Sequence, residues 1–395
     1  MQKSYLMTLY ELAEKDPNVL LLLADSGTSF DELFKKYLPN QILDFGIAEE
    51  NMVAAAAGMA TCGKIPFVYT ASAFLAYRSF EFIRDDACLQ KNNVKFVGMG
   101  EGLSWSTLGA THHTTEELSV LRALPNLVIL SPSSPSVTAE CIKFAYNHNG
   151  PVYIRIGMGG EPELYDETFD ITKNRILKEG KDVAIFATGG ITAEVLKTAK
   201  ILEKNGISAE IVDVCSIKPF DGESVIREAK DKKAIITIEE HSVVGGLGSI
   251  VAEVIADNNL SVNFLRLGLK DTFAKGYGTL DEVRKQNGLD SESLAESVSK
   301  WMKEKGLWLT QALLNLKNLQ KKQTLKTQRL RLFWWVIVQH NILQLQFVVL
   351  VQWKIIQSKW LTLTTTWLML KFWTQLQSFT LKNQNLQLLF NALKS

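Results

Sequence analysis

Residues 49–70, EENMVAAAAGMATCGKIPFVYT, place a candidate helix directly before a short apolar strand. The Ala-rich part, 49–62, is typical of a buried helix, and IPFVYT at 65–70 is typical of a buried strand. The same alternation continues on both sides, with strands expected at 19–25, 94–99, 127–132 and 152–157 and helices at 74–90, 115–124 and 134–147. Strands separated by helices of this length join through crossovers into a parallel sheet that is covered on both faces. The sequence therefore predicts an α/β domain.

A polar, acid-rich segment follows this domain, and the alternation then resumes. Strands are expected at 183–188, 209–214, 234–240 and 262–268, with helices at 191–205, 221–230 and 246–257. The predicted fold class is α/β, with two three-layer α/β domains and an anomalous tail. The expected boundaries are a first domain at 1–160, a linker at 161–180, a second domain at 181–305 and the tail at 306–395.

The tail has an unusual composition. From Leu307 onward there is no Gly, Pro, Asp, Glu, Cys or Tyr, although seven of the nine Trp residues lie there. An ordinary globular domain contains about 7% Gly and 5% Pro. Its apolar runs LFWWVIV and FVVLV are separated by polar residues, and neither approaches the roughly 20 residues needed to span a bilayer. We expect a reading-frame artefact after a natural end near Gly306, or a disordered segment, with a surface-binding helix as the alternative.

Charge and cysteine content limit the class of protein. The net charge is +1, but all 42 Asp and Glu lie in residues 1–304, which makes the body of the chain mildly acidic. This argues against nucleic acid as the main partner. The four Cys form no CxxC pair, as expected for reduced thiols in a cytoplasmic protein. The first 18 residues lack the apolar segment of a signal peptide. We therefore expect a cytoplasmic protein that binds no membrane.

Two adjacent acids, Glu49 and Glu50, stand at the start of the Ala-rich helix. Burying a carboxylate is costly unless a partner offsets its desolvation. An exposed helix start, where the helix dipole favours acids, is the simple explanation for Glu50 and the alternative for Glu49.

Three segments resemble the C-terminal half of the transketolase family: DFGIAEENM at 44–52, THHTTEELSVLRALPNLVILSPSSP at 111–135 and ITIEEHSVVGGLGS at 236–249. The resemblance covers about residues 1–305 and extends to deoxyxylulose-phosphate synthase and, more distantly, to the β subunits of 2-oxoacid dehydrogenases. It implies a pyrimidine-binding domain for thiamine diphosphate, followed by a transketolase C-terminal domain.

The resemblance also implies roles for individual residues. Glu49 follows the GIA triplet and would hydrogen-bond the pyrimidine nitrogen N1′, which drives the ring to the imino tautomer that activates the cofactor. A low-dielectric pocket would strengthen that bond. Phe74 and Tyr77 would seat the ring, with Ala71 where the family has another Phe, and Asp25 would lie near the thiazolium. Core packing is the alternative for both aromatic residues.

Three further residues would contact the substrate. His112 would donate to its carbonyl and hydroxyls, and a surface His doublet is the alternative. Ser29 and Arg155 would hold its anionic end, with a structural ion pair as the alternative for Arg155. Leu108 and Gly100 stand where sugar-phosphate transketolases have an Asp and a His, and Glu101 stands where the synthase has an Arg. These differences make a pentose-phosphate substrate a weaker expectation than thiamine-diphosphate chemistry.

The usual diphosphate motif is missing. Related enzymes hold Mg²⁺ and the cofactor's diphosphate with a GDG motif followed by an Asn, and no GDG occurs here. The first expected strand begins at residue 19, which leaves no room upstream for that domain. We expect a partner, the N-terminal transketolase subunit carrying GDG and the metal, in an α2β2 assembly that is needed for activity.

The expected function is the C-terminal subunit of a split transketolase, which transfers a two-carbon ketol unit from a ketose or its phosphate to an aldose. One alternative is a thiamine-diphosphate synthase or dehydrogenase β-type subunit that uses a 2-oxoacid. A non-catalytic binding protein that keeps the fold is another.

Overall fold

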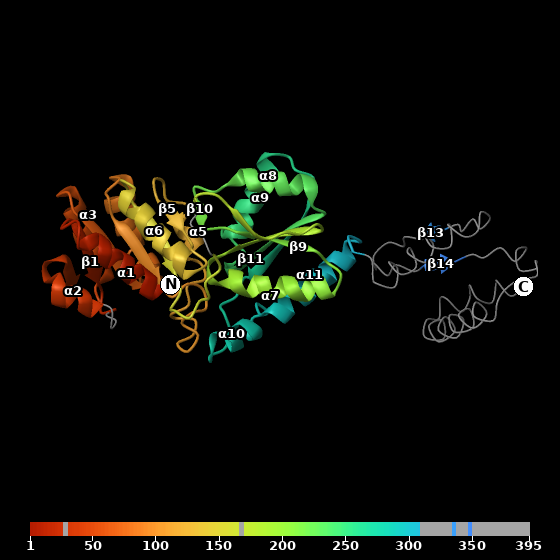
Figure 1. Ribbon diagram of the computed structural model, residues 1–395, viewed down its shortest axis with the longest axis horizontal. Coiled ribbons are helices and arrows are strands. Elements are labelled where there is room, and N and C mark those ends of the chain that lie inside the picture. The colour runs from red at the N-terminus through yellow and green to blue at the C-terminus, as the bar shows by residue number, and fades with distance from the viewer. Residues whose placement is uncertain (27–30, 166–169, 309–333, 337–346, 350–395) are drawn as a thin grey trace, which may run out of the picture. The chain divides into compact units, whose positions relative to one another are not determined.

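The computed structural model of the chain describes residues 1–26, 31–165, 170–308, 334–336 and 347–349 (Figure 1). The chain divides into two compact units, Met1–Leu314 and Asn315–Ser395. In the second unit the described strands β13 (Trp334–Val336) and β14 (Phe347–Val349) pair antiparallel. The rest of what we expected of residues 306–395 falls almost wholly outside the described residues.

The first unit begins with a seven-stranded mixed sheet in the order β10-β5-β6-β4-β3-β1-β2. Its strands are β1 (Val19–Leu23), β2 (Ile42–Asp44), β3 (Ile65–Ala71), β4 (Lys95–Met99), β5 (Val128–Leu130), β6 (Val152–Ile156) and β10 (Ser216–Lys218). All neighbours pair parallel except β10, which pairs antiparallel with β5. Strand β10 comes from the second domain's stretch of sequence, so the chain returns to complete the first sheet.

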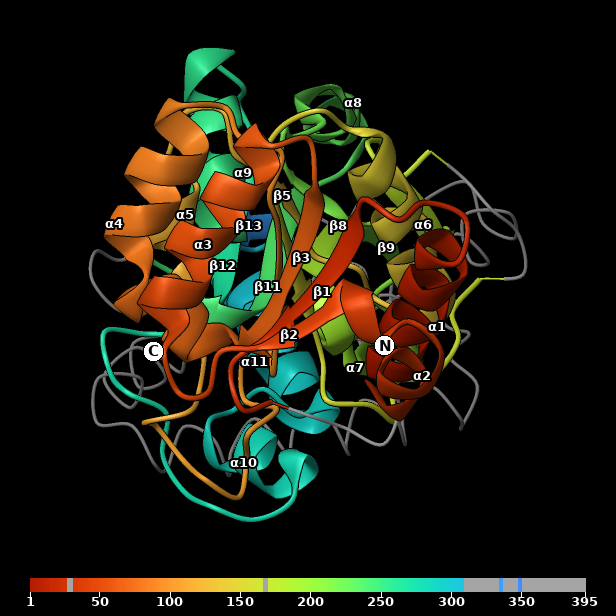
Figure 2. The same cartoon turned by 90° about the vertical axis from the view of Figure 1, so that its left-hand side faces the viewer.

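Side chains that alternate along β1 build two cores. Leu20 and Leu22 join one apolar cluster, while Leu21 and Leu23 join another on the opposite face. The first face is covered by α3 (Glu49–Thr61), η2 (Phe74–Arg78), α4 (Phe80–Phe82), η3 (Ile83–Leu89) and α5 (Glu117–Leu121). The second is covered by α1 (Gln2–Ala13), α2 (Asp31–Tyr37) and α6 (Pro135–Asn147), as Figure 2 shows. The short 3-10 helix η1 (Pro39–Gln41) leads into β2.

The second sheet has five strands in the order β12-β11-β8-β9-β7. They are β7 (Arg175–Lys178), β8 (Val183–Thr188), β9 (Ala209–Asp213), β11 (Ala234–Ser242) and β12 (Asn263–Leu269). Figure 1 shows α8 (Gly222–Asp231) and α9 (Leu247–Asp257) on one face, and α7 (Thr192–Lys204) and α11 (Ser291–Glu304) on the other. The 3-10 helix η4 (Gly189–Ile191) precedes α7, and α10 (Leu280–Gln286) precedes α11.

These two sheets confirm the α/β fold class and correct two details of it. The sheets are mixed, because β10 and β7 are antiparallel edge strands. Strand β7 lies inside the segment that we expected to be a linker. Both strands have only three or four residues, which is too short for an apolar period to show in the sequence.

The expected helix at 74–90 is also different in detail. It consists of two π-helical segments, η2 and η3, on either side of the short α4. Among the described residues, none of the helices combines the length and apolar character needed to cross a membrane.

Candidate active site

The candidate site lies at the carboxyl ends of the parallel strands of the first sheet, where open α/β sheets bind ligands. Asp25 follows β1 with a left-handed backbone conformation (φ +48°), and its N–H donates to the Asp44 side chain over 3.2 Å. The Ser26 hydroxyl donates to Thr70 at the end of β3 over 2.9 Å. Asp25 is exposed at this edge. Ser29 lies outside the described residues.

Glu49 is the first residue of α3 and is only 1% exposed. Its neighbour Glu50 is half-buried. The Arg78 guanidinium donates to Oε2 of Glu49 over 2.5 Å, while no described residue donates a hydrogen bond to Oε1. The helix N-terminus and the Arg78 cation both stabilise a negative charge at this position. The site thus holds a buried carboxylate with one oxygen engaged and one that no described residue engages.

One aromatic residue of η2, Phe74, is linked to this carboxylate through Arg78. The Arg78 guanidinium lies 5.1 Å from the centroid of the half-buried Phe74 ring. The Phe74 ring also packs against His112 in an edge-to-face arrangement, with 5.2 Å between centroids. A series of direct contacts therefore joins Glu49, Arg78, Phe74 and His112. π-Helical turns of this kind occur frequently at functional sites.

Tyr77 is held by the residue that precedes α5. Its hydroxyl donates to Oε2 of Glu116 over 2.8 Å and accepts from the Glu116 N–H over 3.1 Å. Burial, followed by the nearby charges of Glu117 and Glu116, raises the pKa of the Tyr77 hydroxyl. The phenol therefore stays neutral and is held at a fixed, partly exposed position.

His112 is half-buried and is fixed from two sides. Its Nδ1 lies 2.9 Å from the Thr111 hydroxyl, and its ring centroid lies 6.0 Å from that of Trp105. The next residue, His113, is buried, and neither of its ring nitrogens has a hydrogen-bond partner among the described residues. Burial lowers the pKa of His113, which favours a neutral imidazole there.

Trp105 fills the space that a side chain at position 100 would need. Gly100 has a left-handed φ of +89°, and a Cβ at this position would lie 2.1 Å from the indole nitrogen of Trp105. Leu108, in the place of the family's Asp, is 43% exposed. His112 therefore has two aromatic neighbours, Phe74 and Trp105.

Arg155, in β6, is 1% exposed and lies in a charged cluster between the two domains. Its guanidinium donates to the carboxylates of Glu117 and Glu101, the latter over 3.2 Å. It also donates to the backbone carbonyls of Glu240 (2.9 Å) and Thr114 (3.3 Å). These contacts favour the structural ion pair, the alternative interpretation of Arg155.

Both carboxylates of this cluster are poorly solvated. Burial raises the pKa of Glu101 to about 8 against the lowering effect of the Arg155 charge. Burial likewise raises the pKa of Glu117. Arg155 is therefore the charge that makes two buried acids tolerable at the domain junction.

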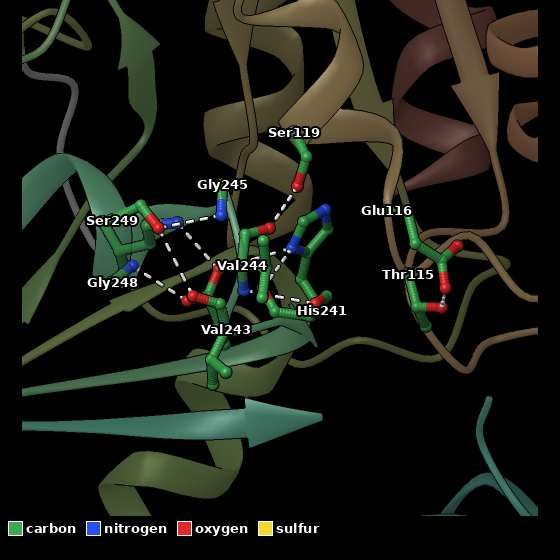
Figure 3. Close-up of polar contacts among 12 residues, drawn as sticks. Thr115, Glu116, Ser119, His241, Val243, Val244, Gly245, Gly248 and Ser249 are labelled. Carbon is green, nitrogen blue, oxygen red and sulfur yellow. Dashed lines mark hydrogen bonds and ion pairs between the residues drawn. The ribbon is translucent and has the colours of Figure 1, made fainter. Parts of the chain in front are cut away.

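The glycine-rich turn of the second domain, residues 243–248, also lies at this junction (Figure 3). The N–H groups of Leu247 and Gly248, at the start of α9, donate to the buried Glu239 carboxylate over 2.7 and 2.8 Å. The helix N-terminus is thus already occupied by a protein anion. The Ser119 hydroxyl, in α5, donates to the Val244 carbonyl over 2.5 Å, which fastens α5 to the turn.

His241 lies near the end of β11, just before the turn, and is wholly buried. Its Nδ1 lies 2.7 Å from the Ser242 carbonyl, and its Nε2 lies 3.7 Å from Oε2 of Glu117. Burial and the Arg155 charge lower the pKa of His241 to about 3, whereas burial raises that of Glu239 to about 7. His241 is therefore neutral, and the turn serves packing between the domains.

The described residues suit the pyrimidine part of thiamine diphosphate, because Glu49 has a carboxyl oxygen that no described residue engages and that could share a proton with a ring nitrogen. They do not provide the metal site. No group of three or more His, Cys, Asp or Glu in the described part of the chain could hold a metal ion. The diphosphate and its metal would require ligands from elsewhere.

Residues 1–158 match the transketolase pyrimidine-binding domain and residues 172–294 match the transketolase C-terminal domain. The chain is 41% identical over 309 residues to a putative transketolase C-terminal section from Methanocaldococcus jannaschii, covering 77% of this chain and 96% of the relative. The chain therefore belongs to the transketolase family.

Two further relatives are likewise single subunits or sections of a transketolase. One subunit of an apulose-4-phosphate transketolase from Actinobacillus succinogenes is 36% identical, covering 70% of this chain and 89% of the relative. A solved split-gene transketolase, described as an inactive β4 tetramer, is 38% identical with a TM-score of 0.68, covering 76% of this chain and 96% of the other. These likenesses identify the chain as similar to the C-terminal subunit of such enzymes.

Sequence reasoning missed three residues of the site. Arg78, Trp105 and Glu116 contact the predicted residues Glu49, His112 and Tyr77, respectively. The spacing of Phe74 and Arg78, four residues apart in a helical segment, is a signal that could have pointed to Arg78. Trp105 and Glu116 carry no comparable signal, because loop geometry alone brings them to the site.

Proposed function

We propose that this chain is the C-terminal subunit of a split, thiamine-diphosphate-dependent transketolase. It would transfer a two-carbon ketol unit from a ketose or its phosphate to an aldose. The observation that supports this best is the buried carboxylate of Glu49, whose Oε1 faces no described donor beside an apolar wall. Thiamine diphosphate supplies the nucleophilic carbon for this chemistry, and the protein supplies orientation and electrostatics.

Each residue of the site has a part in this proposal. Glu49 would hydrogen-bond the pyrimidine, and Phe74 and Tyr77 would hold the ring against it. His112 would donate a hydrogen bond to the substrate carbonyl from its half-buried ring. Asp25 would face the thiazolium, and Ser29 would contact the anionic end of the substrate.

Arg155 has a weaker claim to contact the substrate, because its guanidinium donates to protein acceptors at a buried position. Leu108 stands where the resemblance implies an Asp. Its exposed, apolar side chain supports a substrate that has no hydroxyl to be bound at that point. We therefore assign the chemistry to a ketol transfer and leave the sugar itself open.

A partner subunit is part of the proposal. The relative that is one subunit of a transketolase, and the solved split-gene chain that forms an inactive tetramer, support an enzyme that needs a second polypeptide. That partner would bring the diphosphate motif and Mg²⁺, since the described residues of this chain offer no metal cluster. An α2β2 assembly is the simplest arrangement.

The test is an assay of the chain reconstituted with its partner, Mg²⁺ and thiamine diphosphate. One arm offers a ketose phosphate with an aldose acceptor, and the other offers pyruvate. We expect ketol transfer in the first arm and a loss of about 10²–10⁴-fold in Glu49→Gln. Glu50→Gln is the matched control and should retain activity. Turnover of pyruvate alone would favour the 2-oxoacid alternative, and full activity in Glu49→Gln would exclude the assignment of Glu49.

A further inference from the structure

Arg78 is the residue through which the acid of the site and its aromatic wall are joined. Its guanidinium donates to Oε2 of Glu49 over 2.5 Å and lies 5.1 Å from the centroid of the Phe74 ring. The two contacts use different features of the group, because the N–H edge meets the carboxylate while the cation faces the ring. One side chain therefore fixes both the acid and the wall.

The contact differs from an ordinary surface ion pair. The Arg78 side chain is 40% exposed, but the Glu49 side chain is only 2% exposed. An exposed pair is worth little because solvent screens it, whereas a buried carboxylate needs a donor to remain in place. Arg78 also follows Phe74 by four residues in the π-helical turn η2, so that both side chains come from one element.

The two carboxylate oxygens of Glu49 differ in their contacts. Arg78 engages Oε2, and no described residue donates to Oε1. A carboxylate fixed through one oxygen can rotate little about its last torsion. Its second oxygen then points in a constant direction, which is what a directed hydrogen bond to a ring nitrogen requires.

We propose that Arg78 is a positioning residue, which anchors Glu49 through Oε2 so that Oε1 is aimed at the pyrimidine nitrogen N1′ of the cofactor. This inference rests on the proposed function, because it takes the cofactor to be thiamine diphosphate. Arg78 itself contacts the acid and the Phe74 ring, and acts on the cofactor through them.

The test measures discrimination between two ligands rather than activity. The full chain, in complex with its diphosphate-binding partner and Mg²⁺, is titrated calorimetrically with thiamine diphosphate. The titration is repeated with the analogue in which C–H replaces the N1′ nitrogen. The ratio of the two dissociation constants isolates the contact to N1′, because all other contacts are shared.

Wild-type protein should prefer the natural cofactor by about 10- to 100-fold, as a hydrogen bond to a charged group implies. Arg78→Met should reduce this ratio by about tenfold, since the acid loses its anchor. Arg78→Lys should lose at least about threefold, because an ammonium lacks the planar fork that fixes the carboxylate. Arg84→Met is the matched control; Arg84 pairs with the exposed Asp85 and should leave the ratio unchanged.

The outcomes separate the two proposals. If Arg78→Met weakens both ligands by the same factor, or increases the ratio, Arg78 does not position Glu49 and the inference is wrong. If Arg78→Met does not assemble, the ratio of Arg78→Lys decides, and an unchanged ratio overturns the inference. If wild-type protein binds both ligands equally, the assignment of Glu49 fails and the proposed function fails with it.

Discussion

Replacing Arg155 by Met removes the cation of the buried charged cluster at the domain junction. The side chains are similar in length, so the change removes a buried charge with little loss of packing volume. It leaves the carboxylates of Glu101 and Glu117 without their cation, and it leaves two backbone carbonyls at the junction without this donor. Removing one partner of a buried ion pair costs about 3–5 kcal/mol.

The magnitude translates into a measurable change in thermal stability. A loss of about 3–5 kcal/mol lowers the midpoint of unfolding by on the order of 10 °C for a unit of this size. The loss should be larger at pH 9 than at pH 6. At pH 6 Glu101, whose pKa burial raises to about 8, binds a proton in the folded state and not in the unfolded chain, and burial shifts the pKa of Glu117 in the same direction. Stability then falls as the pH rises, by at most about 1.4 kcal/mol per pH unit for each proton.

The assay is thermal unfolding of the full chain at pH 6 and pH 9, for wild type, Arg155→Met and the exposed control Arg84→Met. The control should lie within about 1 kcal/mol of wild type at both values. A variant Arg155→Met that unfolds like wild type, but raises KM for a phosphorylated substrate in the reconstituted enzyme, would refute the reasoning. It would show that Arg155 binds the substrate and is not part of the frame between the domains.

Three further predictions follow from single groups. The free energy of unfolding of wild type, relative to that of Glu101→Gln, should decrease as the pH rises through about 8. The reason is that the folded state retains a proton on Glu101 below that pH. Urea unfolding across pH 5–9 measures this difference, and a difference that does not change with pH would contradict the prediction. Of the four cysteines only Cys62 is exposed, so a thiol reagent should modify one thiol per native chain and four after denaturation. Modification of more than one thiol in the native state would contradict the burial of the other three. Gly100→Ala should lower the midpoint of thermal unfolding by several degrees and weaken activity, because the new Cβ would displace Trp105 from His112. A variant with the stability and activity of wild type would contradict the packing of Trp105 against Gly100.

The sequence predicts the frame of the fold well, because the central strands are continuous apolar runs. Strand β8 has the predicted bounds, Val183–Thr188, and β3 and β6 differ from prediction by one residue at one end. The antiparallel edge strands β7 and β10 could not be predicted. Their pairing depends on neighbours 33 or more residues away in the chain, and three or four residues carry too little pattern.

For the candidate site, the sequence predicts roles for Glu49 and the aromatic residues, but not the residues that contact them. Glu49 is buried because it lies on the face of α3 that packs on the sheet, together with Met52 and Val53, whereas Asn51 on the other face is exposed. The partners of Arg155 illustrate the limit. Its acceptors in Glu101, Glu117 and Glu240 lie 54, 38 and 85 residues away, and no periodicity in the sequence brings them together.

The central claim is that Glu49 activates a bound thiamine ring. The most direct measurement is the rate at which the thiazolium C2 proton of thiamine diphosphate exchanges for deuterium in the reconstituted complex, followed by NMR after acid quench. The rate in Glu49→Gln should fall by about 10²–10⁴-fold, while Glu50→Gln should exchange like wild type. An equal exchange rate in wild type and Glu49→Gln, with the cofactor bound in both, would contradict the account.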